Sequence, residues 1–122
     1  MLYDHVEVNP ETGYLDARGV HDAVIFRQGK PFLHLIADEI EANLTSKDFT
    51  ASGHLRAKQS LNGVTRTFST SSASWSDATQ RFTMADQIRL QSQGATLLVN
   101  GLTIDMKTGE MHLGSLNGEL RP

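Results

Sequence analysis

Three observations predict that the chain folds as an all-β domain, a twisted (slipped) antiparallel β-jelly roll built from four hairpin repeats. First, four segments of the 122-residue sequence align, starting at Val6, Ile40, Ala73 and Leu102, hence at spacings of 34, 33 and 29 residues. Second, each segment reads apolar-x-apolar on both sides of a polar stretch, the period of two typical of a β-strand. Third, each polar stretch opens with Asn, Ser or Asp, which favour turns. We expect a single domain over residues 1–122.

The first element is a hairpin over residues 6–17, and its turn has the right chemistry. Pro10 presets the backbone for a type I turn, and Gly13 suits the left-handed residue that closes it. The fourth hairpin, 102–113, repeats this scheme with Gly109 but without a proline. In the second hairpin, 40–51, and the third, 73–84, Lys47 and Gln80 occupy the glycine position. We therefore expect those two turns to be strained or longer.

A residue that favours a break in the strand follows each hairpin, at Gly19, Gly53, Asp86 and Gly114. We expect a further strand after each of these breaks, over residues 20–26, 55–59, 88–91 and 116–120.

Residues 34–44 are ambiguous, because Ile36, Ile40 and Leu44 have helical spacing and good helix formers lie between them. The equivalent segments of the other repeats resolve the ambiguity. Residues 70–77 are rich in Ser and Thr, and residues 99–105 contain an Asn-Gly pair and β-branched residues. We therefore predict a strand here too.

Stacking the repeats places apolar residues on one face and polar residues on the other. The predicted inner columns are Val6, Ile40, Ala73 and Leu102; Val8, Ala42, Trp75 and Ile104; Leu15, Phe49, Phe82 and Met111; and Ala17, Ala51, Met84 and Leu113. The outer positions are Glu7, Glu41, Ser74 and Thr103, and Asp16, Thr50, Thr83 and His112. Such a stack ends in exposed strand edges at both termini, and we place Thr103 and Leu116 at the C-terminal edge.

The repeated unit resembles the OstA-type repeat of the lipopolysaccharide-transport family. Its clearest copy runs from Leu35-Ile36-Ala37-Asp38-Glu39-Ile40-Glu41-Ala42-Asn43, through a short turn, to Asp48-Phe49-Thr50-Ala51-Ser52-Gly53-His54-Leu55-Arg56. Residues 101–113 look most like the C-terminal repeat of LptC-type proteins, with LptA-like proteins as the alternative within the family.

The resemblance implies a non-enzymatic protein of the Gram-negative periplasm that takes part in outer-membrane biogenesis. It would hold the lipid A acyl chains of lipopolysaccharide in an apolar groove. It would also dock edge to edge with other Lpt jelly-roll proteins, and with an inner-membrane transporter complex, through its N- and C-terminal edge strands. An LptC-type protein would be anchored to the inner membrane by a segment absent from this chain.

The groove residues that we predict are positions of the apolar columns and of the strands that follow them. They are Ile40, Ala42, Phe49, Ala51, Leu55, Trp75, Phe82, Met84, Ile88, Ile104, Met111 and Leu113. Large aromatic faces and adaptable methionines suit many weak contacts with acyl chains. The same residues are also what a plain hydrophobic core requires. The alternative function is therefore a structural β-solenoid scaffold that polymerises through its edges and binds no lipid.

Other chemistry finds little support in the sequence. A formal charge of −3 argues against nucleic acid, and the absence of cysteine excludes disulfides and thiolate sites. The five histidines lack metal-site spacing, the Ser-rich run at 69–74 lacks a nucleophile elbow, and the acidic run at 38–41 lacks a calcium loop. We predict no catalytic residue, no metal and no cofactor. Four cations either meet lipid phosphates at a groove mouth or are ordinary surface charges: Arg56, Lys58, Arg66 and Arg89.

Overall fold

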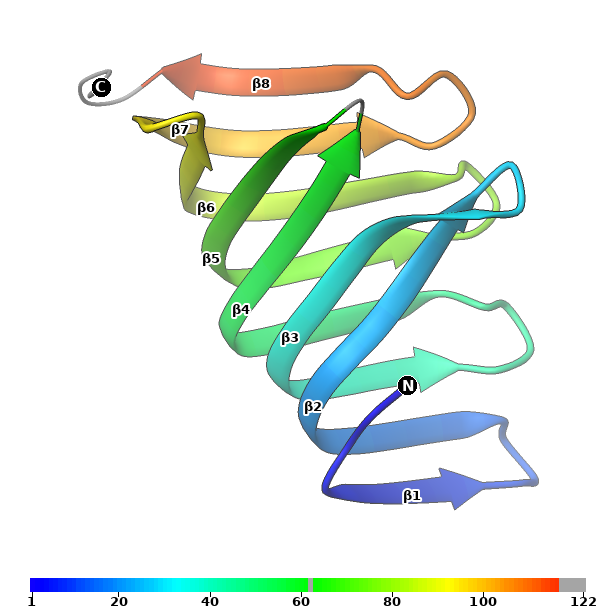
Figure 1. Ribbon diagram of the computed structural model, residues 1–122. Coiled ribbons are helices and arrows are strands. Elements are labelled where there is room, and N and C mark those ends of the chain that lie inside the picture. The colour runs from blue at the N-terminus through cyan, green and yellow to red at the C-terminus, as the bar shows by residue number, and fades with distance from the viewer. Residues whose placement is uncertain (62, 117–122) are drawn as a thin grey trace.

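The computed structural model describes residues 1–61 and 63–116, and this part of the chain is all β (Figure 1). Consecutive strands pair antiparallel in one sheet, in the order β1 to β8. The strands are β1 (His5–Asn9), β2 (Tyr14–Arg27), β3 (Lys30–Asn43), β4 (Phe49–Leu61), β5 (Val64–Ser76), β6 (Arg81–Ser92), β7 (Ala95–Asp105) and β8 (Met111–Leu116). The predicted all-β class and hairpin repeats are confirmed, and residues 34–44 form a strand rather than a helix.

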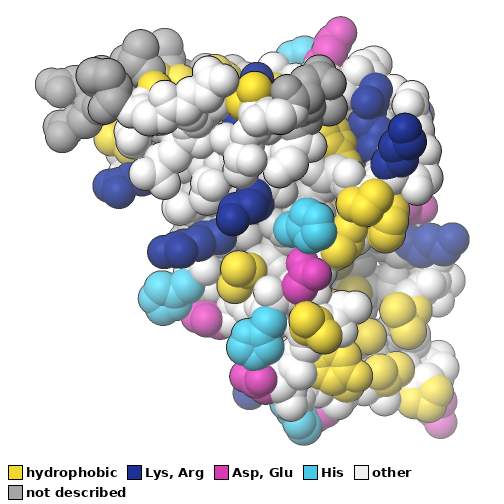
Figure 2. All heavy atoms as spheres, viewed as in Figure 1, with side chains coloured by type: hydrophobic (Ala, Val, Ile, Leu, Met, Phe, Trp, Pro, Cys, Tyr) yellow, Lys and Arg dark blue, Asp and Glu magenta, His cyan; other side chains and the backbone are white. Residues whose placement is uncertain are grey.

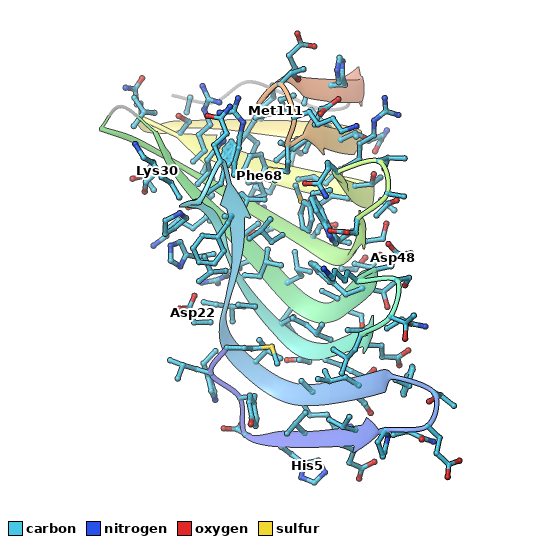
Figure 3. The ribbon with its side chains drawn as sticks, turned by 90° about the vertical axis from the view of Figure 1, so that its right-hand side faces the viewer. His5, Asp22, Lys30, Asp48, Phe68 and Met111 are labelled. Atoms are coloured by element: carbon cyan, nitrogen blue, oxygen red, sulfur yellow. The ribbon has the colours of Figure 1, made fainter. Side chains whose placement is uncertain are left out.

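The sheet bends on itself, so that each long strand contributes to two facing layers (Figures 1 and 3). The first layer holds β1, β8 and the parts of β2 to β7 next to the turns at 10–13, 44–48, 77–80 and 106–110. The second layer holds the remaining parts of β2 to β7. The bend coincides with register shifts between Val20 and Ala23 in β2, Ser52 and Leu55 in β4, and Met84 and Gln87 in β6. Such bulges bend a strand without ending it.

This bend corrects one prediction. Gly19, Gly53 and Asp86 do not separate two strands, because each lies inside one long strand, β2, β4 or β6. The residues predicted as separate strands at 20–26, 55–59 and 88–91 are the second-layer parts of those strands. Of the predicted strand at 116–120, Leu116 ends β8, and 117–120 lie outside the described residues.

The predicted apolar columns merge into two rows that cross the first layer. One row pairs Val6, Ala17, Ile40, Ala51, Ala73, Met84, Leu102 and Leu113. The other pairs Val8, Leu15, Ala42, Phe49, Trp75, Phe82, Ile104 and Met111. Between them lies the predicted polar row, which faces outward. Burial follows this pattern except at the ends, where Val8 and Leu113 stay 49% and 42% exposed, because β1 and β8 have no second-layer part to cover them.

The core fills the space between the two layers as one cluster. The second layer contributes Leu35, Ala57 and Phe68, which are fully buried. Figure 3 shows Phe68 inside the bend, whereas His5 points away from it. The two layers therefore enclose an apolar interior from β2 to β7.

The turns bear out one prediction and add a feature that the repeats did not reveal. Lys47 and Gln80 take the left-handed conformation that glycine takes in the other two turns, with φ of 64° and 57°. These turns are therefore strained, as predicted. At the opposite end of the strands, Gln28-Gly29 and Gln93-Gly94 have two consecutive positive φ values, as in a type I′ hairpin turn. These two turns were not predicted from the sequence, although a residue followed by Gly between two strand-like runs is a known signal for a hairpin turn.

Candidate functional site

The interior contains ten of the twelve predicted groove residues, all except Ala42 and Leu113, and most of them are fully packed. Eight are at most 9% exposed: Ile40, Ala51, Leu55, Trp75, Phe82, Met84, Ile88 and Ile104. Ala42, Phe49 and Met111 are half-buried, and Leu113 is exposed. The predicted residues are thus brought together on the inner face, but as a closed core with partly open ends.

A small mouth leads into this interior between the two layers. A hollow of about 280 Å³ is lined from the second layer by Val24, Ile25 and Phe26, and from the first layer by Phe49 and Trp75 with the polar residues Lys47, Asp77 and Gln80. The volume lies at or below the lower limit for drug-sized ligands, about 300 Å³. The hollow is therefore a small recess that is open to solvent and lined by both apolar and polar residues.

Aromatic rings connect this mouth to the core. The Phe49 and Trp75 rings stack with centroids 6.5 Å apart and planes at 25°, and Phe49 lies 6.4 Å from the Phe82 ring. Phe82 is fully buried, whereas Phe26 on the facing layer is 57% exposed. Phe49 therefore connects Trp75 at the hollow to Phe82 in the core. Phe26 did not stand out in the sequence, because no repeat column contains it.

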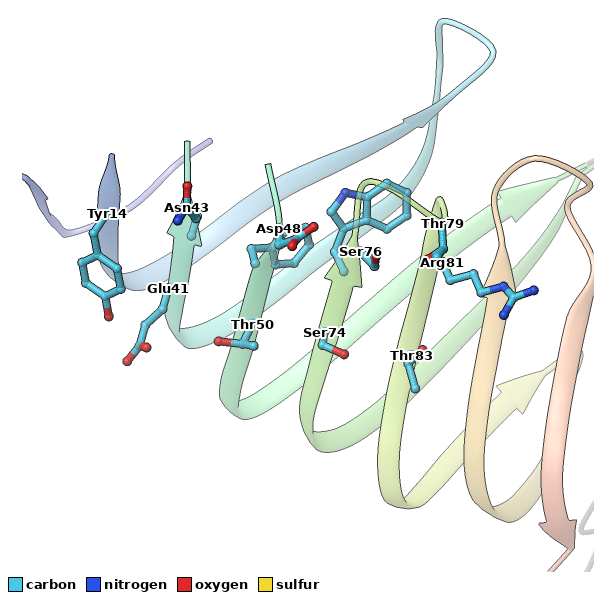
Figure 4. Close-up of a pocket in the computed structure, with 13 residues that line it drawn as sticks. Tyr14, Glu41, Asn43, Asp48, Thr50, Ser74, Ser76, Thr79, Arg81 and Thr83 are labelled. Carbon is cyan, nitrogen blue, oxygen red and sulfur yellow. The ribbon is translucent and has the colours of Figure 1, made fainter. Parts of the chain in front are cut away.

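A larger, shallow groove of about 560 Å³ lies on the outer face of the first layer (Figure 4). Glu41, Thr50, Ser74 and Thr83 are directly opposite one another on β3 to β6 and form its floor. The groove is hollow because the side chains of Thr50, Ser74 and Thr83 are small. Tyr14 lies at one end, where a hydrogen bond with Glu41 raises the pKa of the Tyr14 hydroxyl. Ala42, Phe49 and Trp75 also line this groove, so it combines polar and apolar surface.

Three carboxylates from neighbouring strands gather next to this groove. One carboxylate oxygen each of Asp16, Glu39 and Glu41 lies within 4.8 Å of the other two. A side-chain hydrogen bond with Asp16, followed by desolvation and the charges of Asp16 and Glu41, raises the pKa of Glu39, while Arg18 opposes the shift. The neighbouring carboxylates therefore hold the pKa of Glu39 above its ordinary value. The acidic run was visible in the sequence, but Asp16 joins it only through the β2–β3 register.

Each histidine lies next to one carboxylate. His21 is 2.7 Å from Asp4, and His54 is 2.8 Å from Asp38. The other three pairs join His34 to Asp22, His5 to Glu7 and His112 to Glu110. His54 and His112 are exposed, as their outward positions in the repeat predicted. The histidines are spread over the surface, each beside a single carboxylate.

The four cations that were candidates for a groove mouth divide between the two faces. Arg56, Lys58 and Arg89 are exposed and lie on the outer face of the second layer, away from the mouth. Arg66 is half-buried and sits opposite the buried Gln59 on the inner face. The mouth-of-groove hypothesis is therefore wrong for the first three, because strand alternation turns them outward.

The two terminal strands leave free edges. β1 pairs only with β2, and β8 pairs only with β7 among the described residues. Thr103, predicted at the C-terminal edge, instead lies on β7 between Thr83 and His112. The edge belongs to β8, which includes Leu116.

These features define a class: a single antiparallel sheet bent into a β-jelly roll, with an apolar interior and, within residues 1–61 and 63–116, two unpaired edges. One solved structure with this fold is LptH, described as the LptA-homologous periplasmic component of the conserved lipopolysaccharide transport device from Pseudomonas aeruginosa. The two chains superpose with a TM-score of 0.70 and 17% sequence identity, over 93% of this chain and 80% of LptH. No protein-family profile and no curated protein matches the sequence. The likeness shows a shared fold of the LptA-like type.

No helix in residues 1–61 and 63–116 has the length and hydrophobicity that crossing a membrane requires.

Proposed function

We propose that this protein is a periplasmic, non-catalytic component of a lipopolysaccharide-transport bridge, which shields the acyl chains of the lipid between its two layers. The observation that carries the proposal is the aromatic mouth formed by Phe26, Phe49 and Trp75, which opens onto a continuous apolar interior. The shared fold with LptH supports it. That likeness favours an LptA-like role over an LptC-type protein anchored to the inner membrane.

The proposed shielding needs only apolar surface. Removing apolar area from water contributes roughly 25 cal/mol per Å², so many weak contacts hold an acyl chain without an ion pair. The packed interior must open for this. Arg27 of β2 joins the second layer to the first-layer turn, because its Nε donates to the Met106 carbonyl oxygen, so this hydrogen bond would have to break for the layers to part there. The exposed Val8 and Leu113 extend the inner rows to both ends of the stack. An acyl chain would therefore pass from one domain to the next along these rows.

Partner proteins would dock at the two edge strands, β1 and β8. A strand from a sister domain, or from an inner-membrane transporter complex, would pair with β1 or β8 and continue the sheet. Pairing of β8 of one copy with β1 of the next is a heterologous contact, which builds an open row of domains rather than a closed dimer. The two apolar rows would then run on from one domain to the next.

The tight packing of the interior favours a second candidate function. Eight of the twelve predicted groove residues are at most 9% exposed, as in an ordinary core. A structural scaffold that polymerises through its edges would need no more than this. The two functions differ in one respect, which is saturable lipid binding.

Displacement of a fluorescent lipid A analogue tests the proposal. We expect saturable binding that Phe26→Asp weakens at least tenfold, because a carboxylate at the mouth would have to be desolvated beside the chain. Leu44→Asp is the matched control: Leu44 is also exposed, at 53%, but lies in the turn after β3 and does not line the mouth. Substitutions at such exposed sites change stability by about 0.5 kcal/mol or less. Absence of saturable binding, or equal loss in both variants, would reject the lipid-binding function and leave the scaffold.

A further inference from the structure

The outer face of the second layer carries a row of residues that the proposed lipid-binding interior does not use. Arg56 on β4 is directly opposite Ser69 on β5, and Ser69 is directly opposite Arg89 on β6. Side chains opposite one another in a sheet have Cβ atoms about 4.5–5.5 Å apart. Two guanidinium groups therefore flank one hydroxyl, and all three residues line a hollow of about 400 Å³.

A second row lies beside the first and extends the hollow. Lys58 is directly opposite Thr67, and both line a neighbouring hollow of about 570 Å³. The two hollows share Arg56 and Thr67, so they form one continuous depression. Figure 2 shows dark-blue Lys and Arg side chains gathered on this face of the molecule, above His and acidic side chains.

The cations of this depression lack protein counterions. No carboxylate oxygen of the described residues lies within 4.0 Å of Arg56, Lys58 or Arg89, in contrast to Arg18 and Arg81. The histidines at the margin have their own partners, because His34 is bound to Asp22 and His54 to Asp38. Three unpaired positive charges thus stand together on a protein whose net charge is −3.

We propose that Arg56, Ser69 and Arg89 bind a phosphate group of a phosphorylated ligand, with Lys58 and Thr67 beside it. Guanidinium groups match phosphate oxygens with paired N–H donors, and the Ser69 hydroxyl donates a further hydrogen bond. A phosphomonoester carries about −1.5 to −2 charges, which suits two arginines better than a single carboxylate does. The site lies on the opposite face of the sheet from the apolar interior, so it does not depend on the proposed lipid function.

Titration of the ¹⁵N-labelled chain with inorganic phosphate and with a hexose phosphate, at constant ionic strength set with chloride, tests the site. We expect saturable shifts of the backbone amides at Arg56, Ser69 and Arg89. The double variant Arg56→Gln/Arg89→Gln should weaken binding at least tenfold. The control Lys30→Gln/Lys107→Gln removes the same number of charges from exposed positions outside the depression, and should bind as the unmodified chain does.

A parallel measurement identifies the source of the phosphate. Co-sedimentation with phosphatidylcholine vesicles, with and without phosphatidylglycerol, presents the same chemistry as a lipid headgroup. Binding of the soluble phosphates that is lost in Arg56→Gln/Arg89→Gln supports a free or sugar-borne phosphate, and binding to the anionic vesicles alone, lost in the same variant, supports a headgroup. Absence of saturable binding in both arms, or equal loss in both double variants, would overturn the site. Failure of lipid A binding alone would leave it standing.

Discussion

At the bend of β4, two consecutive residues, Gly53 and His54, have positive φ values of 82° and 46°. Gly53 also faces a neighbour closely, because a Cβ added there would lie 2.5 Å from the Asp38 carboxylate that binds His54. The sequence marked Gly53 as a break between strands. Its role is to let one strand turn from the first layer into the second.

Gly53→Ala should therefore destabilise the fold more than Gly94→Ala does. Both positions have a left-handed backbone, which costs an L-residue about 1–2 kcal/mol. Gly94 has φ of 80° and open space around its Cβ position, so it serves as the matched control. Urea unfolding of both variants gives the comparison. Equal losses would mean that the contact with Asp38 does not constrain the bend.

The raised pKa of Glu39 makes the stability of the folded protein depend on pH. Its hydrogen bond to Asp16 and the nearby carboxylates raise the pKa above the ordinary value of 4.5, so the folded state holds this proton more tightly than the unfolded state. The resulting penalty is complete above the raised pKa and is removed as the pH falls towards 4.5. Glu39→Gln abolishes the titration.

We therefore expect Glu39→Gln to raise the melting temperature at pH 7, by an amount that shrinks as the pH is lowered to 4.5. Glu11→Gln at an exposed turn changes the net charge equally and is the control. Melting curves by circular dichroism at several pH values provide the measurement. A pH-independent difference, or an equal gain in the control, would contradict the role of the carboxylate cluster.

Among the strands, β1 and β8 are where the proposed assembly would occur. The Asp105 N–H donates to the Glu110 carbonyl, so Asp105 and Glu110 form a hydrogen-bonded pair. Hydrogen-bonded and non-hydrogen-bonded pairs alternate along an antiparallel ladder, so Leu113 and Leu102 form a non-hydrogen-bonded pair. The N–H of Leu113 therefore points away from β7, toward the free edge. The first hairpin has the equivalent turn, with Gly13 donating to Asn9, so the N–H of Val8 likewise faces the free edge of β1.

Leu113→Pro and Val8→Pro should each block head-to-tail association while leaving the monomer folded, because proline is tolerated where a strand's N–H faces solvent. A mixture of the two variants should still form heterodimers through the intact β8 of one and the intact β1 of the other. Analytical ultracentrifugation of each variant and of the mixture distinguishes the cases. Unchanged association of either variant, or no heterodimer in the mixture, would count against pairing of β8 with β1.

The strands show how far the sequence determines the fold. Alternation and recurrence in residues 6–17 and their three counterparts predicted the hairpins, the inner and outer faces, and the strained turns at Lys47 and Gln80. The bend was not predicted, because a bulge inserts a residue without interrupting the alternation on either side. For the same reason the sequence left two places open for Arg56 and Arg89, a groove mouth or the plain surface, since their face depends on the register beyond the bulge.

For the whole molecule, the sequence could identify which residues are apolar and inward but not whether the interior is open. Phe82 and Trp75 are equally apolar in the sequence, yet Phe82 is sealed in the core and Trp75 stands beside the mouth. That difference depends on how far apart the two layers lie. The proposed function depends on the same distance, because a ligand chain must separate layers that are packed when empty.

Trp75 offers the most direct test of this central claim, because it is the single tryptophan of the chain and stacks on Phe49 at the mouth. Lipid A with brominated acyl chains quenches tryptophan fluorescence only on contact. We predict saturable quenching of Trp75 by the brominated lipid, and none by the same lipid without bromine. Binding of the lipid without quenching would place its chains outside the interior and contradict the account.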